Sequence, residues 1–141
     1  MPKASKKLLD ALNEALTEEL ASTIQYLWQH VMARGLQSPA IASLFKQTSM
    51  VEMNHAYKVA ERIDLLGGVP TTAVGAVKVG GDLKKMLEDD LEAEHTAVEM
   101  YRNLVNLADK EGDVVTLRLV EEVLGETEEH THLLAAILDK I

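Results

Sequence analysis

Five residues of the types that bind transition metals recur along this sequence at spacings that suit helices. They are three glutamates and two histidines: Glu19, Glu52, His55, Glu94 and His130. Glu52 and His55 are three positions apart, so on a helix their side chains lie on successive turns of one face. Carboxylate and imidazole ligands together suit iron, manganese or zinc, whereas calcium prefers oxygen ligands. These residues therefore predict the chemistry of a protein-bound transition metal.

The two halves of the sequence repeat each other. A shift of 75 positions carries Glu19 onto Glu94 and His55 onto His130, and the glutamate-to-histidine separation is 36 positions in both halves. Such a repeat indicates two similar structural units. We expect each unit to supply one glutamate and one histidine to a shared site.

The repeat also shows where one acidic residue is missing. The same shift carries Glu52 onto position 127, where the sequence has Thr127 instead of a carboxylate. At about 100° per residue, Glu126 lies about 60° from the inward direction of its helix. Glu126 is therefore the acid that we expect to lean inward and replace the missing carboxylate.

Helical phase separates the candidate ligands from similar residues near them. His130 lies within about 20° of the inward direction of its helix, whereas His132 lies about 180° away. The pair Glu129 and His132 has ligand spacing but is predicted to face solvent. His95 follows Glu94 directly and points about 100° away from it, so we do not expect it to bind the metal.

Four helices must position these side chains. Apolar residues recur every three or four positions, which predicts helices over residues 5–34, 38–66, 82–112 and 113–141. Ser38, Asp82 and Asp113 are the predicted N-caps, and Pro39 fits the first turn of the second helix. The expected fold class is all-α, with residues 1–141 forming one domain.

The connection between the second and third helices is long and unlike the others. Residues 67–81 contain five glycines and a proline, which favours an extended segment. Helices of this length span roughly 40 Å, and an extended segment of this size reaches about as far. Short, long and short connections predict a ferritin-like four-helix bundle, in which the long crossover runs the length of the bundle.

The inward faces of the helices carry acids without matching bases. The first three helices each place a glutamate in the middle of the apolar face, and no Lys or Arg falls in any of the four inward stripes. An internal salt bridge is the ordinary explanation for a buried glutamate, but these stripes offer no partner. Because an unpaired buried carboxylate is strongly unfavourable, the pattern favours a shared metal cation.

The composition of the sequence limits the partners, the metal-site types and the location that we expect for the protein. The net charge is −9 with no cysteine, which argues against nucleic-acid partners and excludes disulfides and thiolate metal sites. No apolar run reaches the roughly 20 residues of a membrane helix, and the N-terminal stretch lacks the pattern of a signal peptide. We therefore expect a cytoplasmic protein with no membrane partner.

Four segments resemble the helices of bacterioferritins and related ferritin-like di-iron carboxylate proteins: "EELASTIQYLWQH", "VEMNHA", "DDLEAEHTAVEMYRNL" and "ETEEHTHLL". The resemblance covers nearly the whole chain, including the crossing "GGVPTTAVGAVKVGGD". It implies that Glu19 and His55 are terminal ligands of one iron, that Glu94 and His130 are terminal ligands of the other, and that Glu52 bridges the two.

The family's second bridging carboxylate falls at Thr127, where this sequence departs from the pattern. We expect the half with Glu19, Glu52 and His55 to bind metal well. The half with Glu94 and His130 is expected to bind weakly, or to need Glu126 or water.

The resemblance also implies roles for two residues outside the ligand set. Met53 occupies the position where bacterioferritins carry the methionine that binds haem b across a two-fold interface; ordinary packing at a dimer surface is the alternative. Tyr26 resembles a family tyrosine near the di-iron centre. Tyr26 and Tyr101 each lie two turns from a glutamate on the same face, so we expect them either to hydrogen-bond a ligand or donate an electron, or to be ordinary core residues. Trp28 is expected to pack at a dimer interface, and His30 to be either a core residue or a transient iron site.

For function, the resemblance implies a ferroxidase that binds Fe(II) and oxidises it with O2 or H2O2 for iron storage or detoxification. Such proteins self-associate as homodimers or as larger homo-oligomers and cages. Bacterioferritin cages use a fifth helix, and this sequence ends at Ile141, so a smaller assembly is also open. The rivals are a rubrerythrin-like peroxide-reducing protein and a non-catalytic, metal-stabilised bundle that acts through protein interactions.

Overall fold

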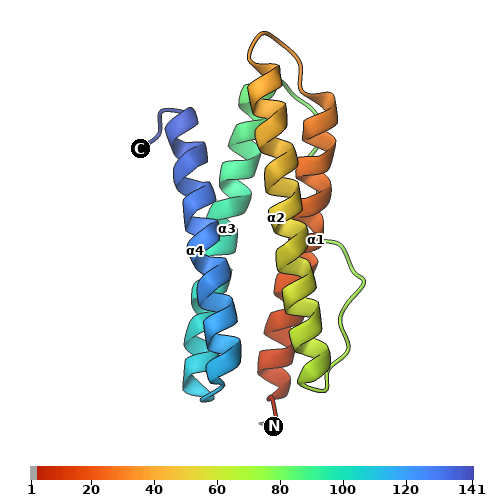
Figure 1. The fold of residues 1–141 in the computed structure, drawn as a ribbon, viewed down its shortest axis with the longest axis vertical. Helices are drawn as coiled ribbons and strands as arrows, with labels where there is room; N and C mark the ends of the chain where they lie inside the picture. The colour runs from red at the N-terminus through yellow and green to blue at the C-terminus, as the bar shows by residue number, and fades with distance from the viewer. Residues whose placement is uncertain (1–2) are drawn as a thin grey trace.

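The computed structural model describes residues 3–141, and within that range it consists of four α-helices and no strand. The helices run along a common axis (Figure 1) and are α1 Lys6–Met32, α2 Ser38–Leu65, α3 Leu83–Lys110 and α4 Val114–Ile137. Short turns join α1 to α2 and α3 to α4, while the connection from α2 to α3 runs the length of the bundle. The predicted all-α, ferritin-like bundle with a long crossover is confirmed.

The crossover is held against α1 by hydrogen bonds. The amide of Gly75 donates to the carbonyl of Thr17 at 3.2 Å, and the amide of Lys78 donates to Oε1 of Gln25 at 2.9 Å. A Cβ atom at position 75 would lie 2.8 Å from Oε1 of Glu18. That oxygen is the end of a flexible side chain, which would have to move if position 75 carried a Cβ atom.

Three helix starts are capped by side chains. Ser5, Asp82 and Asp113 each accept a hydrogen bond from the amide three positions later, so the predicted caps of α3 and α4 are confirmed. The prediction of Ser38 as the cap of α2 is wrong. Gln37 is the cap residue and already has helical dihedral angles, so Ser38 begins the helix itself.

All four helices end earlier than their apolar spacing predicts, and α4 ends earliest relative to the prediction. α1 ends at Met32 because Ala33 is extended (φ −60°, ψ 133°). α4 ends at Ile137 and does not continue to residue 141, because the chain turns at Asp139, whose φ is 55°. Apolar residues beyond this turn are no longer held toward the core, and Ile141 is 83% exposed.

The hydrophobic core is divided into two clusters, one toward each end of the bundle. One cluster lies near the N-terminal end of α1 and includes Leu8, Leu12, Leu16, Val59, Ile63, Tyr101, Leu104, Val120 and Val123. The other contains Tyr26, Ala33, Phe45, Met86, Leu87, Leu91 and Leu134. Between them lies a layer of buried polar residues. No helix of the described structure is both long and apolar enough to cross a membrane.

Candidate metal centre

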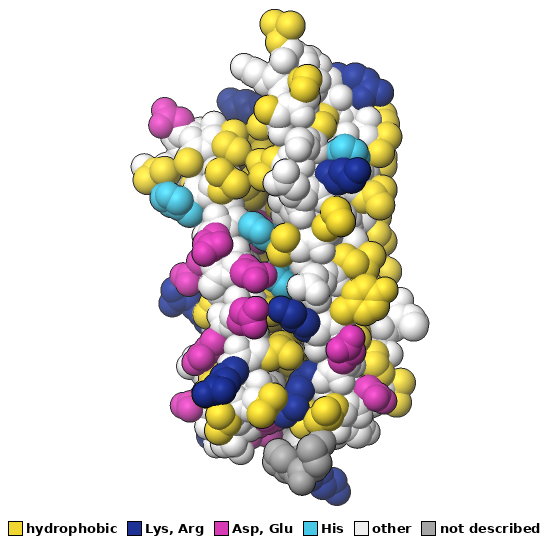
Figure 2. Space-filling view, in the orientation of Figure 1, with side chains coloured by type: hydrophobic (Ala, Val, Ile, Leu, Met, Phe, Trp, Pro, Cys, Tyr) yellow, Lys and Arg dark blue, Asp and Glu magenta, His cyan; other side chains and the backbone are white. Residues whose placement is uncertain are grey.

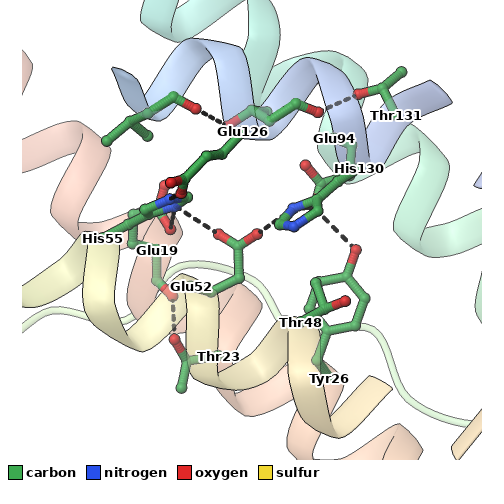
Figure 3. Close-up of polar contacts among 12 residues, drawn as sticks. Glu19, Thr23, Tyr26, Thr48, Glu52, His55, Glu94, Glu126, His130 and Thr131 are labelled. Atoms are coloured by element: carbon green, nitrogen blue, oxygen red, sulfur yellow. Dashed lines mark hydrogen bonds and ion pairs between the residues drawn. The ribbon is translucent and has the colours of Figure 1, made fainter. Parts of the chain in front are cut away.

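The buried layer between the two apolar clusters draws residues from all four helices (Figure 3). Glu19 comes from α1, Glu52 and His55 from α2, Glu94 from α3 and His130 from α4. His55 has no exposed surface, and the three glutamates are 3–4% exposed. All five predicted residues are brought together, because their apolar neighbours at spacings of three and four pack into the two core clusters.

These residues form two overlapping groups that share Glu52. Ligand atoms of Glu19, Glu52 and His55 lie within 4.8 Å of one another, and so do those of Glu52, Glu94 and His130. A carboxylate has two oxygens, so the shared glutamate can serve one ion in each group. The arrangement suits two metal ions bridged by Glu52.

Several atoms in this layer are close together without forming hydrogen bonds. Nδ1 of His55 lies 3.5 Å from Oε2 of Glu19, and Nδ1 of His130 lies 3.2 Å from Oε1 of Glu52. These four atoms are buried and have no hydrogen-bond partner among the described residues. Buried polar atoms are nearly always satisfied, so atoms that converge in this way fit metal ligands.

Two tyrosines fix the outer glutamates from the opposite half of the repeat. Tyr26 of α1 donates to Oε1 of Glu94 of α3 at 2.9 Å, and Tyr101 of α3 donates to Oε1 of Glu19 of α1 at 2.8 Å. Both tyrosine side chains are buried. The bond from Tyr101 leaves Oε2 of Glu19 to face His55, whereas Oε1 of Glu94 accepts from Tyr26 and also lies 3.9 Å from Nδ1 of His130.

The electrostatics of the cluster favour a cation. Burial raises the pKa values of Glu19 and Glu94 well above their ordinary range, and the negative charge of Glu52 adds to the effect. Burial acts against the ionised form of Glu52 as well, but its close polar contacts with Glu19, His130 and His55 lower its pKa.

The pKa of His55 is raised, although the residue is buried. Burial alone would lower its pKa, but the nearby carboxylates of Glu19 and Glu52 raise it to about 11. An imidazolium there supplies part of the positive charge that the acids need. A divalent metal would supply more and would displace these protons, because metal ligands must be deprotonated.

Position 127 supplies no acidic group. Thr127 is 2% exposed, and its hydroxyl donates to the carbonyl of Val123 at 2.7 Å. The proton of the hydroxyl is therefore held by its own helix.

Glu126 does reach inward, as its helical phase predicts. Its carboxylate contacts Nε2 of His55 (Figure 3), and its side chain remains 37% exposed. Nε2 is the nitrogen on the far side of the ring from Glu19 and Glu52. In this arrangement Glu126 orients a residue of the first group and does not join Glu94 and His130 in the second.

The neighbouring histidines lie outside the cluster. His95, His132 and Glu129 are exposed, as predicted from their phase. His30 is half-buried, and its Nδ1 lies 2.6 Å from the carbonyl oxygen of Ala42. Because a carbonyl oxygen only accepts, Nδ1 is the donor of this hydrogen bond. Of the two roles considered for His30, this contact favours that of a packed core residue.

Several buried charged groups were not identified from the sequence, among them Asp90 and Arg62. Asp90 is fully buried and accepts a hydrogen bond from Gln25 at 2.8 Å; burial raises its pKa to about 7. Arg62 is 9% exposed and pairs with Asp113 at 2.8 Å, away from the metal ligands. Asp90 lies one turn before Glu94, a spacing that could have revealed it. Arg62 immediately precedes the inward Ile63, so strict helical spacing passed over it.

Two hollows reach the cluster from opposite sides. One, of about 160 Å³, lies between α1, α3 and the crossover and touches Glu19, Glu52 and Glu94. The other, of about 430 Å³, lies between α2 and α4 and is lined by Glu126 and His130, among others. Figure 2 shows acidic and histidine side chains gathered along the groove between these two helices. Small ions can therefore approach the centre from either face.

The fold and this cluster define a class: four-helix bundles with a carboxylate and histidine centre between two helical hairpins. The family model for the ferritin-like domain matches residues 9–141. This chain belongs to the ferritin-like family.

Individual relatives agree with this assignment. The chain is 34% identical to the bacterioferritin of Desulfovibrio desulfuricans, with 88% of this chain and 70% of the relative covered. It is 32% identical to the bacterioferritin of Brucella melitensis, with 97% and 86% covered.

Solved structures show the same architecture. A ferritin-like, diiron-carboxylate protein from Bacillus anthracis superposes with a TM-score of 0.92 at 27% identity, covering 94% of this chain and 96% of the other. The Rhodobacter capsulatus bacterioferritin, described with a metal-free dinuclear site and a haem iron, superposes with a TM-score of 0.89 at 29% identity, covering 98% and 87%.

Proposed function

We propose that this chain binds two iron ions in the central layer and oxidises Fe(II) for iron storage or detoxification. Glu19 and His55 would hold one ion, Glu94 and His130 the other, and Glu52 would bridge them. The observation that carries this proposal is the set of buried, unpartnered ligand atoms that converge from all four helices. Membership of the ferritin-like family favours iron over other metals of similar ligand preference.

The proposed reaction has Fe(II) as its substrate. Two ions held by a shared carboxylate can each give up one electron to the same oxidant. With two protons, the electrons reduce one O2 to H2O2, or one H2O2 to two water molecules. The protein's part is to hold both ions beside each other and to keep the site buried.

The two half-sites would differ in affinity. The first group has two carboxylates and His55, whose far nitrogen is oriented by Glu126. Outer hydrogen-bond partners of this kind strengthen a histidine ligand. The second group lacks both a carboxylate at position 127 and an equivalent of Glu126, so we expect it to fill second.

Self-association and haem binding extend this proposal. Met53 is 42% exposed and lines an apolar groove of about 430 Å³ together with Leu16, Leu20, Ala56 and Tyr57. Such a patch is suited to a two-fold dimer contact, and the methionine sulfur would face haem b if haem binds there. We propose that the protein works in the cytoplasm as a homodimer or a larger homo-oligomer.

Thr127 favours one rival function, a metal-stabilised bundle without oxidase activity. An anaerobic Fe(II) titration followed by admission of air separates the two. We expect two irons per chain and oxidation faster than that of Fe(II) in buffer. Glu52→Gln should abolish both, while Glu129→Gln, an exposed acid on α4, should match the wild type. Metal-dependent stabilisation without faster oxidation would favour the rival.

A further inference from the structure

The centre has a bridging carboxylate on one side only. Glu52 approaches from α2, and its counterpart in the internal repeat is Thr127 on α4. Thr127 is 2% exposed and therefore lies inside the layer that holds the metal ligands. Its side chain ends short of the place that a glutamate carboxylate would reach.

Neither Thr127 nor its acidic neighbour fills that place. The threonine hydroxyl is bonded to the carbonyl of Val123 at 2.7 Å, and a neutral hydroxyl offers no charge to a cation. The carboxylate of Glu126 is engaged with Nε2 of His55 instead (Figure 3). The α4 side of the centre is thus left without an anionic ligand.

The charges and the unpartnered atoms at the centre indicate which kind of ligand is missing. The three buried glutamates carry at most three negative charges for the four positive charges of two ferrous ions, and the fourth carboxylate, that of Glu126, lies beyond His55 and not among the ligand atoms. Oε1 of Glu52 and Nδ1 of His130, on the side of the second group, are buried and unpartnered. One further anion with two oxygens would supply negative charge directly at the ligand atoms and the absent bridge.

A route to this position exists on the same side of the bundle. The hollow between α2 and α4 has a volume of about 430 Å³ and is lined by Glu126, the residue before Thr127, and by His130, which lies about one turn after it. It is wide enough for a small solute such as formate or acetate.

From these observations we propose that the position beside Thr127 binds a small oxyanion of the formate or acetate class, which bridges the two metals where the repeat lacks a glutamate. This inference rests on the two-metal site of the proposed function. An acetate ion has the same end group as a glutamate side chain, so it can replace the truncated part. A bulky carboxylate such as pivalate would be excluded by the packed layer.

The test measures metal binding and not turnover. The apo protein is titrated with Co(II), followed by calorimetry and visible absorption, in carboxylate-free buffer with formate, acetate, pivalate or chloride at matched ionic strength. For the wild type, formate or acetate should tighten binding of the second ion by about tenfold or more. Pivalate and chloride should have no such effect.

The matched variant supplies the bridge within the chain. Thr127→Glu should bind two ions without added anion, and formate should no longer affect it, whereas Thr127→Ser should respond like the wild type. Circular dichroism checks the fold of each variant. If Thr127→Glu does not fold, Thr127→Asp takes its place, and the formate and pivalate comparison on the wild type remains decisive.

The outcomes separate this inference from the proposed function. If the wild type binds two ions equally well with and without formate, or if pivalate acts as formate does, the oxyanion site is refuted and the two-metal centre stands. If neither the wild type nor Thr127→Glu binds a second ion under any condition, the two-metal centre itself is refuted.

Discussion

Replacing Asp90 by asparagine is expected to stabilise the protein above neutral pH. Asp90 is fully buried, and burial raises its pKa from 3.8 to about 7, although the hydrogen bond from Gln25 and the nearby Gln29 side chain act in the opposite direction. Its Oδ2 and the Oε1 of Gln29 are both unpartnered. An asparagine amide has no charge to bury, keeps the acceptor for Gln25, and offers donors near Gln29.

The sign and size of the effect follow from proton linkage. An unfolded aspartate loses its proton near pH 4, whereas the folded one keeps it until about pH 7, so the wild type loses stability as the pH rises between these values. That difference in pKa corresponds to roughly 4 kcal/mol at pH 8, taken as an upper figure. Asp90→Asn lacks this loss. Its advantage should be small at pH 4 and largest at pH 8.

Urea unfolding of the apo protein in the presence of a chelator, at pH values from 4 to 8, measures this difference. Asp109→Asn removes one acid from an exposed position on the same helix and serves as the control. A difference between Asp90→Asn and wild type that does not change with pH would refute the reasoning. So would a variant that is less stable at pH 8 than the wild type.

Three further changes test the packing and the hydrogen bonds around the site. Arg62→Ala leaves Asp113 buried without its partner at 2.8 Å and should lower the free energy of unfolding in urea by about 3–5 kcal/mol. The double variant with Asp113→Ala should lose less than the sum of the two single variants. Phe45→Ala removes a fully buried side chain and should lower the free energy of unfolding by about 3–5 kcal/mol, measured from a lower urea midpoint. A loss below about 1 kcal/mol would contradict the place of Phe45 in the core. Tyr101→Phe removes the 2.8 Å bond to Glu19 and should weaken binding of the first Co(II) by about 10–100-fold in calorimetry, and unchanged affinity would show that this bond does not position the ligand.

The fold and the convergence of the ligands could be predicted because both follow from periodicity. Apolar spacing defines the inward face of each helix, and the repeat places Glu19 and Glu94 at equivalent points of two hairpins. Phase alone distinguished the inward His130 from the exposed His132. These are properties of an ideal helix, and they require no knowledge of individual contacts.

What periodicity could not predict depends on side-chain reach and on local turns. The side chain of Glu126 is long enough to contact either His55 or His130, and only the packed structure shows that it contacts His55. Arg62 is buried because Asp113 at the start of α4 lies opposite, which is a contact between distant segments. Ser38 has the right residue type for a cap, but the turn before it is already helical.

The polar layer between the two apolar clusters has a consequence for how the hairpins align. Apolar side chains of similar size could pack almost equally well if one hairpin slid along the other by a helical turn or two. The crossed bonds from Tyr26 to Glu94 and from Tyr101 to Glu19 form in only one register, much as a single buried asparagine fixes the alignment of a coiled coil. Sliding would bury the glutamates against leucine and valine, which strongly disfavours every other alignment. The residues proposed to hold iron therefore also fix the register in which the two hairpins pack. Variants that replace the whole layer by leucine should gain stability but lose a unique native structure.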